Sequence, residues 1–298
     1  MGGSCLVPAW RRYRLALMSG LGDHEAMSVS KNLVVNHGSG RLVGECRPGP
    51  DPTVVLLHAG VTDRRSWRVV SAAINGYATV VSYDRRGFGD TAPSTEEFSH
   101  VGDLLAVLDE VADGPVWLVG SSAGGGVALD TALTAPERVA GLVLISPAVS
   151  GTQVPELDAD TARFGRLIDQ AMEAGDLDEV NRLETWLWLD GPAQPEGRVA
   201  GPARDLLLDM NRVLLGNGMP EEAGASGIDA WSQLERVKVP ATVACGDLDV
   251  PFFVERSRQL AERLPNGRYR VLAGMAHLPQ LEDPETVADV IAAALTVH

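Results

Sequence analysis

The sequence predicts an α/β fold, in which a mostly parallel, doubly wound sheet of eight strands carries an inserted helical cap. From residue 30 onward, short apolar runs alternate with helical stretches, which is typical of parallel strands joined by crossover helices. Most of these runs are continuous and rich in β-branched residues, as expected for strands buried on both faces. The alternation stops between Pro147 and about Ile228, where the sequence becomes helical, acidic and rich in Pro and Gly.

The predicted strands and helices follow one another in order. Leu33–Val35 and Arg41–Cys46, on either side of the turn His37–Gly40, predict an opening hairpin. Six strands of the buried type follow, at Val54–Leu57, Thr79–Tyr83, Val116–Val119, Leu142–Ile145, Ala241–Ala244 and Tyr269–Leu272. Helices are predicted between them, near residues 66–74, 98–112, 123–134, 252–263 and 285–296.

The same pattern divides the chain into four parts. They are an N-terminal extension at 1–29, a core in two pieces at 30–147 and 229–298, and the cap at 148–228. Residues 153–231 hold 16 Asp or Glu against 6 Arg, so this stretch carries −10 of the net charge of −15. Most of these charges are expected on a solvated helical surface. Three large aromatics of this stretch either pack a small core of the cap or line a substrate pocket, and both interpretations stay open: Trp186, Trp188 and Trp231.

The N-terminal extension predicts neither a signal peptide nor a membrane span. Its apolar stretch Leu15–Leu21 is short and is interrupted by Ser19 and Gly20. Disorder of this segment and a translation start at Met18 or Met27 are both compatible with the sequence.

The composition argues against several classes of function. A net charge of −15, with Lys31 and Lys238 as the only lysines, argues against nucleic acid, because phosphate binding needs clustered basic side chains. Cys5, Cys46 and Cys245 are widely spaced, so neither a disulfide framework nor a zinc site is predicted. We therefore expect a cytoplasmic protein that acts on a small molecule, without nucleic acid or a membrane as partner. The sequence does not indicate the oligomeric state.

A candidate nucleophile lies between a predicted strand and a predicted helix. Residues 120–124, Gly-Ser-Ser-Ala-Gly, match the pattern Gly-x-Ser-x-Gly. In such a turn the serine has a strained backbone, and the residues two before and two after it must be small. Both of these residues are glycine for Ser122, whereas Val119 would flank Ser121. Ser122 is therefore the candidate nucleophile, and a serine that merely caps the helix is the alternative.

A serine hydroxyl needs a base within hydrogen-bond reach. His277 follows the last predicted strand, in a loop at the carboxyl end of the parallel sheet, where active sites of such sheets assemble. The other histidines lie in tails, in the hairpin turn, after the third strand or near a helix start. An acid that orients the base should follow a neighbouring strand, and both Asp247 and Asp249 do so. Either carboxylate could turn inward.

Five motifs, in this order, resemble those of the α/β-hydrolase family. They are His58-Ala59-Gly60, the turn Asp84-Arg85-Arg86-Gly87-Phe88-Gly89-Asp90-Thr91, the Gly-x-Ser-x-Gly turn, Gly246-x-x-Asp249 and His277. The resemblance covers the chain from about residue 31 to the C-terminus, apart from the cap. It implies a triad of Ser122 as nucleophile, His277 as general base and Asp249 as acid, since the Gly-x-x-Asp spacing favours Asp249 over Asp247.

The resemblance also implies an oxyanion hole made of two backbone N–H groups, those of Gly60 and Ala123. His58 resembles the structural histidine of the family. Two positions depart from its pattern: Ala59 replaces the commoner Gly, which narrows the oxyanion loop slightly, and Thr91 stands where Ser is frequent.

No cofactor or metal is expected. The spacing of Gly87, Gly89 and Ala92 formally fits a dinucleotide fingerprint, but Pro93 follows and no helix start is evident there to receive a pyrophosphate. The sequence contains no phosphate-binding loop and no His/Cys metal spacing.

The resemblance implies a serine hydrolase that cleaves a small ester or lactone through an acyl-enzyme. The excess of acids in the cap segment predicts that the substrate is neutral, because a negative potential repels anions. Hydrolysis of a C–C bond, and perhydrolase or haloperoxidase chemistry, would use the same triad and stay open. A non-catalytic receptor of the same fold is a third interpretation. An Asp-dependent dehalogenase or epoxide hydrolase is disfavoured, because those relatives have Asp where this chain has Ser122. The physiological substrate is not identifiable from the sequence.

Overall fold

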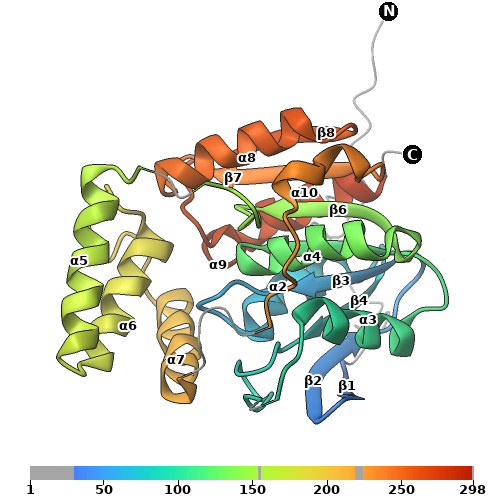
Figure 1. The fold of residues 1–298 in the computed structure, drawn as a ribbon, viewed down its shortest axis with the longest axis horizontal. Coiled ribbons are helices and arrows are strands. Elements are labelled where there is room, and N and C mark those ends of the chain that lie inside the picture. Colours follow the sequence, from blue (N-terminus) through green and yellow to red (C-terminus); the bar gives the residue numbers. More distant parts are fainter. Residues whose placement is uncertain (1–29, 95, 154–155, 219–223, 297–298) are drawn as a thin grey trace, which may run out of the picture.

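The computed structural model describes residues 30–94, 96–153, 156–218 and 224–296, and its centre is one eight-stranded sheet (Figure 1). The predicted extension at 1–29 lies outside the described residues. The strands are β1 Lys31–His37, β2 Gly40–Arg47, β3 Thr53–Leu57, β4 Thr79–Tyr83, β5 Val116–Ser121, β6 Val139–Ile145, β7 Ala241–Gly246 and β8 Gly267–Leu272.

The strand order is β1-β2-β4-β3-β5-β6-β7-β8. β2 pairs antiparallel with β1 and with β4, and every other pairing in the described sheet is parallel. The predicted fold class, α/β with a mostly parallel eight-stranded sheet, is thus confirmed. The parallel strands carry the loops that follow them to one edge of the sheet.

The last strand differs from its prediction. Tyr269–Leu272 was expected to be buried on both faces, but Arg268, Arg270 and Val271 of β8 are exposed. The reason is its place in the sheet, since β8 is an edge strand with a neighbour on one side only.

Helices cover both faces of the sheet, as a doubly wound fold requires. They are η1 Arg64–Trp67, α2 Arg68–Ile74, α3 His100–Val111, α4 Ala123–Thr134, η2 Pro136–Arg138, η4 Trp231–Arg236, α8 Pro251–Arg263, α9 Pro279–Glu282 and α10 Pro284–Leu295. α2 and α10 share one hydrophobic core with the strands, and α3, α4 and α8 share the other. Each core is continuous from helix to strand, so the sheet is held from both sides.

The segment between β6 and β7 contains α5 Ala159–Glu173, α6 Leu177–Thr185, η3 Trp186–Asp190 and α7 Pro202–Asn217. We call these elements the cap. They stand together beside the sheet (Figure 1). Phe164, Val180 and Leu183 form a small core of their own with neighbouring apolar side chains. Asp158 and Asp176 precede α5 and α6 as capping residues, and their carboxylates accept hydrogen bonds from backbone N–H groups in the first turn of each helix. Of the described helices, none is long and apolar enough to cross a membrane.

A buried ion pair joins the loop after β4 to α3 and to the first hairpin. The Arg86 guanidinium donates to the Asp103 carboxylate at 2.8 and 2.7 Å, and also to the carbonyl of His37. The ring of His37 lies 2.9 Å from the same carboxylate. Because Asp103 is fully buried, its charge is balanced inside the protein and not by water.

We expect Asp103→Asn to lower the free energy of unfolding by about 3 kcal/mol, because it leaves a buried guanidinium without its counter-charge. The matched control is Asp109→Asn, which removes an exposed partner of Arg138 and should cost less than about 1 kcal/mol. Urea unfolding of both variants measures the difference. An equal loss of unfolding free energy in both variants would contradict a stabilising role of the buried Arg86–Asp103 pair.

Candidate active site

The predicted nucleophile lies on a strained turn. β5 ends at Ser121, α4 begins at Ala123, and Ser122 between them has φ 51° and ψ −117°, which is unusual for a residue with a side chain. The Ser122 N–H donates to the Ile145 carbonyl at 2.8 Å, and the Ser122 carbonyl accepts from the N–H of Ala148 at 3.0 Å. The Ser122 side chain makes no capping hydrogen bond to α4, so the interpretation of this serine as a helix cap is wrong.

Glycine on both sides of this turn is a steric requirement. A Cβ atom at Gly120 would lie 2.4 Å from the carbonyl oxygen of Gly124, and one at Gly124 would lie 2.3 Å from that of Leu57. Ser121, by contrast, is the last residue of β5 and is fully buried. The turn therefore presents the hydroxyl of Ser122, which is partly exposed.

The predicted base and acid meet. His277 follows β8, and its Nδ1 lies 2.9 and 3.0 Å from the two carboxylate oxygens of Asp249, which follows β7. Both side chains are buried. Asp247 is exposed and accepts a hydrogen bond from the N–H of Gly274 at 2.6 Å. Of the two candidate acids, the structure brings Asp249 to His277, and the Nδ1 contact leaves Nε2 of the ring to act as the base.

Aromatic rings enclose His277 on two sides. The ring of Trp188 in the cap lies 4.6 Å from it, centroid to centroid, and the ring of Phe253 in α8 lies 4.5 Å from it. Of the three predicted pocket tryptophans, Trp188 is therefore the one that contacts the candidate triad. Trp186 packs on Phe164 in the core of the cap.

Trp231, the third of these tryptophans, lies on η4, beyond the predicted end of the cap. Its ring faces the guanidinium groups of Arg256 and Arg263, at 4.7 and 4.3 Å. Phe253 had not been singled out from the sequence. The available signal was its position four residues after Asp249, at the start of a predicted helix.

A salt bridge ties the cap to the loop that carries His277. Arg198 donates to two carbonyls of η3, those of Leu189 and Asp190, each at 2.7 Å. The same guanidinium pairs with Glu282. Glu282 in turn accepts the N–H of Ala276, the residue before His277, at 2.7 Å. The cap thus fixes the backbone that positions the candidate base, a link that no local sequence pattern indicated.

Burial raises the pKa of Glu282, and the hydrogen bond and charge of Arg198 lower it by a smaller amount. Removing Arg198 would therefore leave this carboxylate buried without its main counter-charge.

The two predicted oxyanion donors are neighbours. A Cβ atom placed on Gly60 would lie 3.9 Å from the Cβ of Ala123. Within the described part of the chain, the backbone N–H of neither residue forms a hydrogen bond. These are two free donors side by side, next to Ser122, which is the arrangement that binds a developing oxyanion.

His58 fastens the loop that carries Gly60. Its Nδ1 donates to the Ala59 carbonyl at 2.8 Å, and its Nε2 accepts the N–H of Arg85 at 3.1 Å. Burial, and secondarily the charge of Arg85, lower the pKa of His58 well below its usual 6.5. This histidine is therefore neutral, and both ring nitrogens are engaged by backbone groups.

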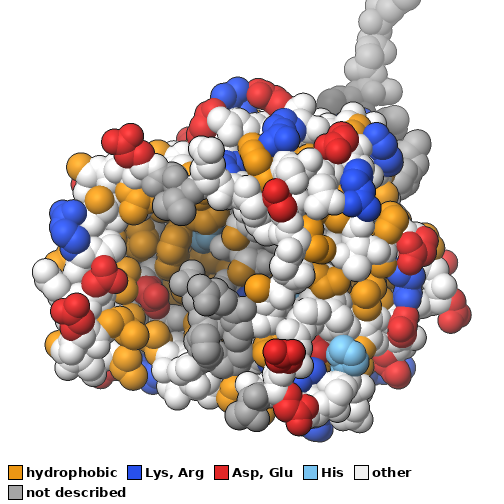
Figure 2. All heavy atoms as spheres, viewed as in Figure 1, with side chains coloured by type: hydrophobic (Ala, Val, Ile, Leu, Met, Phe, Trp, Pro, Cys, Tyr) orange, Lys and Arg blue, Asp and Glu red, His pale blue; other side chains and the backbone are white. Residues whose placement is uncertain are grey.

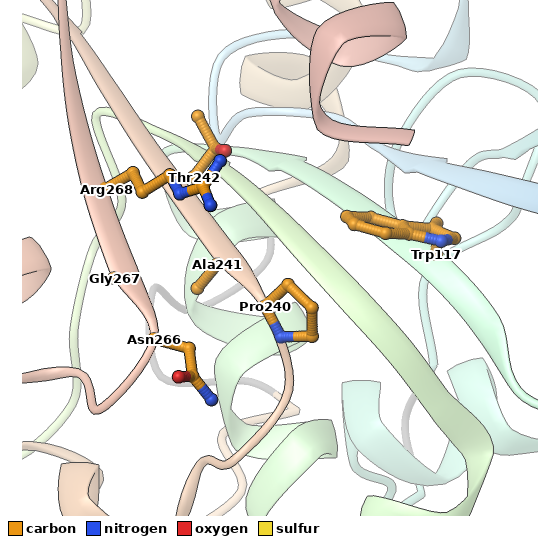
Figure 3. A pocket seen from close by; sticks show the side chains of 7 residues that line it. All are labelled: Trp117, Pro240, Ala241, Thr242, Asn266, Gly267 and Arg268. Carbon is orange, nitrogen blue, oxygen red and sulfur yellow. The ribbon is translucent and has the colours of Figure 1, made fainter. Parts of the chain in front are cut away.

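Two cavities differ in their relation to this site. One, of about 320 Å³, is bounded by one side of α4 from Ala123 to Asp130, by Arg85 and by residues 224–228. It lies beside the predicted oxyanion donor Ala123. The other, of about 270 Å³, is lined by Trp117 and by the first residues of β7 and β8 (Figure 3). That is the opposite edge of the sheet from His277, so we do not assign it to the site.

Within the described ranges, no cluster of three or more His, Cys, Asp or Glu side chains could hold a metal ion.

Comparison with known proteins places this site in context. The chain matches the model of the alpha/beta hydrolase family over residues 54–290. It is 26% identical, over 89% of its own length and 98% of the relative's, to a putative 2-succinyl-6-hydroxy-2,4-cyclohexadiene-1-carboxylate synthase of Bacillus subtilis. It is 35% identical to the lipase LipV of Mycobacterium tuberculosis, over 58% of this chain and 62% of the lipase.

Solved structures share the fold. A thermophilic esterase from Thermogutta terrifontis aligns with a TM-score of 0.70 at 20% identity, over 90% of this chain and 98% of the esterase.

The geometry of the turn predicts which serine reacts with an electrophile. A fluorophosphonate probe should label the protein once, at Ser122, because only this hydroxyl lies on the strained and partly exposed turn. Ser122→Ala should abolish labelling, and the control Ser121→Ala should retain it. Peptide mass spectrometry locates the modified residue, and a label on Ser121 would contradict the assignment.

Proposed function

Because the chain belongs to the alpha/beta hydrolase family, we propose that it is a serine hydrolase that cleaves a small, neutral carboxylic ester or lactone. One observation carries the proposal. The buried hydrogen bond between His277 and Asp249 lies at the same edge of the sheet as the strained turn of Ser122. A base held by an acid, at the same edge of the sheet as a partly exposed serine, has the components that activate a hydroxyl for attack on a carbonyl.

The proposed reaction proceeds through an acyl-enzyme. Ser122 Oγ attacks the carbonyl carbon while Nε2 of His277 takes the hydroxyl proton, and the negative charge collects on the carbonyl oxygen. The N–H groups of Gly60 and Ala123 bind that oxygen. The tetrahedral intermediate then expels the alcohol, which leaves with the proton from His277. Water, activated by the same ring, releases the acid and restores Ser122.

The surroundings of the site support a small and largely apolar substrate. A cavity of about 320 Å³ has the size of a small-ligand pocket and reaches Ala123, while Ser122 and His277 do not line it. The rings of Trp188 and Phe253 form apolar walls at His277. Figure 2 shows a hollow between the cap and the sheet that is lined by hydrophobic side chains.

The acid of the triad can be tested by amide substitution. Asp249→Asn should lower kcat for a p-nitrophenyl ester by roughly 10³ to 10⁴, because an amide holds His277 in the wrong tautomer. Asp247→Asn is the matched control, since this exposed carboxylate contacts only backbone, and it should retain most of the activity. If the two effects are reversed, the proposed triad is wrong. A wild-type protein that binds the ester without hydrolysing it would favour a receptor.

The charge of the cap predicts a preference among substrates. The excess of acids over residues 153–231 creates a negative potential near the site, which repels anions and is screened over a Debye length of about 10 Å at 0.1 M salt. A neutral methyl ester should therefore have a higher kcat/KM than its ω-carboxylate analogue, and added salt should narrow the gap. A preference for the anion at low salt would overturn this part of the proposal.

A further inference from the structure

Arg85 lies beneath the loop that carries Gly60. It follows β4, and its side chain is only 4% exposed. Its guanidinium stands 4.5 Å from the ring of Phe88, and in the described ranges no carboxylate forms an ion pair with it. Burial lowers the pKa of Arg85 to about 10, so the group is charged at neutral pH. A buried cation of this kind is costly to maintain, and its contacts indicate why it is there.

Arg85 donates hydrogen bonds to two successive carbonyls of the loop that carries Gly60. Its Nη2 donates to the carbonyl of Ala59 at 3.1 Å and to that of His58 at 3.3 Å. The Ala59 carbonyl also accepts from Nδ1 of His58 at 2.8 Å. Longer hydrogen bonds reach the same oxygen from the N–H of Thr62 at 3.4 Å and from its hydroxyl at 3.5 Å. The two shortest contacts, from one charged and one neutral donor, therefore contribute most to the direction of this carbonyl.

The Ala59 carbonyl and the Gly60 N–H are the two ends of the same planar peptide group. In a trans peptide these ends point in opposite directions, so fixing the carbonyl toward Arg85 aims the N–H away from it. The cation also draws electron density toward the oxygen, which makes the N–H a stronger donor. In the described chain this N–H has no acceptor of its own, and Gly60 lies beside Ala123.

We propose that Arg85 is a positioning residue for the reaction, which orients and polarises the Ala59–Gly60 peptide so that its N–H stabilises the oxyanion. This inference rests on the proposed function, because it assigns a purpose to the Gly60 donor of that same site. A positioning role for Arg85 differs from a packing role in one respect. The stabilisation that Arg85 provides grows as negative charge develops on the substrate oxygen, and it is small when the substrate is merely bound.

Arg85→Met, which keeps an unbranched apolar stem, should lower kcat by roughly tenfold to a hundredfold, less than the 10² to 10³ that loss of a direct donor costs. KM should change by less than about twofold, because ground-state binding does not use the charge. The kcat of Arg85→Lys, which keeps a cation but loses the planar guanidinium, should lie between those of the wild type and Arg85→Met. Thermal unfolding of both variants identifies any loss that comes from misfolding, and Arg85→Lys carries the test if Arg85→Met does not fold.

A pair of inhibitors separates oxyanion stabilisation from packing. A trifluoromethyl ketone adds to the serine as a hemiketal oxyanion, whereas the methyl ketone of the same chain binds mainly as the intact ketone. The inhibition constant of the trifluoromethyl ketone should rise in Arg85→Met by the same factor by which kcat/KM falls, and that of the methyl ketone should not change. Arg86→Lys is the matched control, since Arg86 binds Asp103 and does not contact the loop. It should leave the ratio of the two constants at the wild-type value.

Equal weakening of both ketones, or full kcat in folded Arg85→Met, would overturn the inference while wild-type ester hydrolysis upheld the proposed function. A wild-type protein that neither hydrolyses esters nor binds the trifluoromethyl ketone more tightly than the methyl ketone would reject both.

Discussion

The site depends on one steric constraint, the close approach of α4 to the end of β3. There is no room for a Cβ atom at Gly124, because the carbonyl oxygens of Leu57 and His58 would lie 2.3 and 2.6 Å from it. This contact sets the first turn of α4 against the loop that carries Gly60, so Ala123 lies beside Gly60. Ser122, between β5 and α4, has a positive φ. The candidate nucleophile and the two proposed oxyanion donors lie around this one approach of two backbones.

The cap segment also packs against the two loops that carry Asp249 and His277. Gly191 lies against the loop of the acid, since a Cβ there would be 2.4 Å from the Leu248 carbonyl, and it also approaches Ala276. Arg198 joins the same part of the cap to Glu282 and to the Gly274 carbonyl. The cap thus contacts the loops of both Asp249 and His277. A shift of the cap would therefore alter the orientation of the candidate base, and in the proposed function this would couple substrate selection to the chemistry.

The sequence predicted those features that are local. Continuous apolar runs located six of the eight strands, because a strand buried on both faces needs no distant partner to be apolar. The first two strands were located by the turn His37–Gly40 between them. The small flanks of Ser122 and the position of His277 after the last strand identified both residues. Distant pairings outside the family's motifs were not predictable, since neither Arg198 with Glu282 nor Arg85 with Ala59 shares a motif. Exposure of β8 was missed for the same reason, because strand order decides which strand forms an edge.

Backbone strain is concentrated at the same edge of the sheet. Among the described residues other than glycine, Ser122 and Ser146 are those with positive φ, at 51° and 45°. They follow the neighbouring strands β5 and β6, and each N–H is held at 2.8 Å by a carbonyl of the next strand, that of Ile145 or Ala244. Such conformations cost about 1 to 3 kcal/mol each and persist where surrounding contacts leave no alternative. The buried sheet therefore supplies the rigidity that holds the candidate nucleophile, Ser122, in a conformation that its own side chain disfavours.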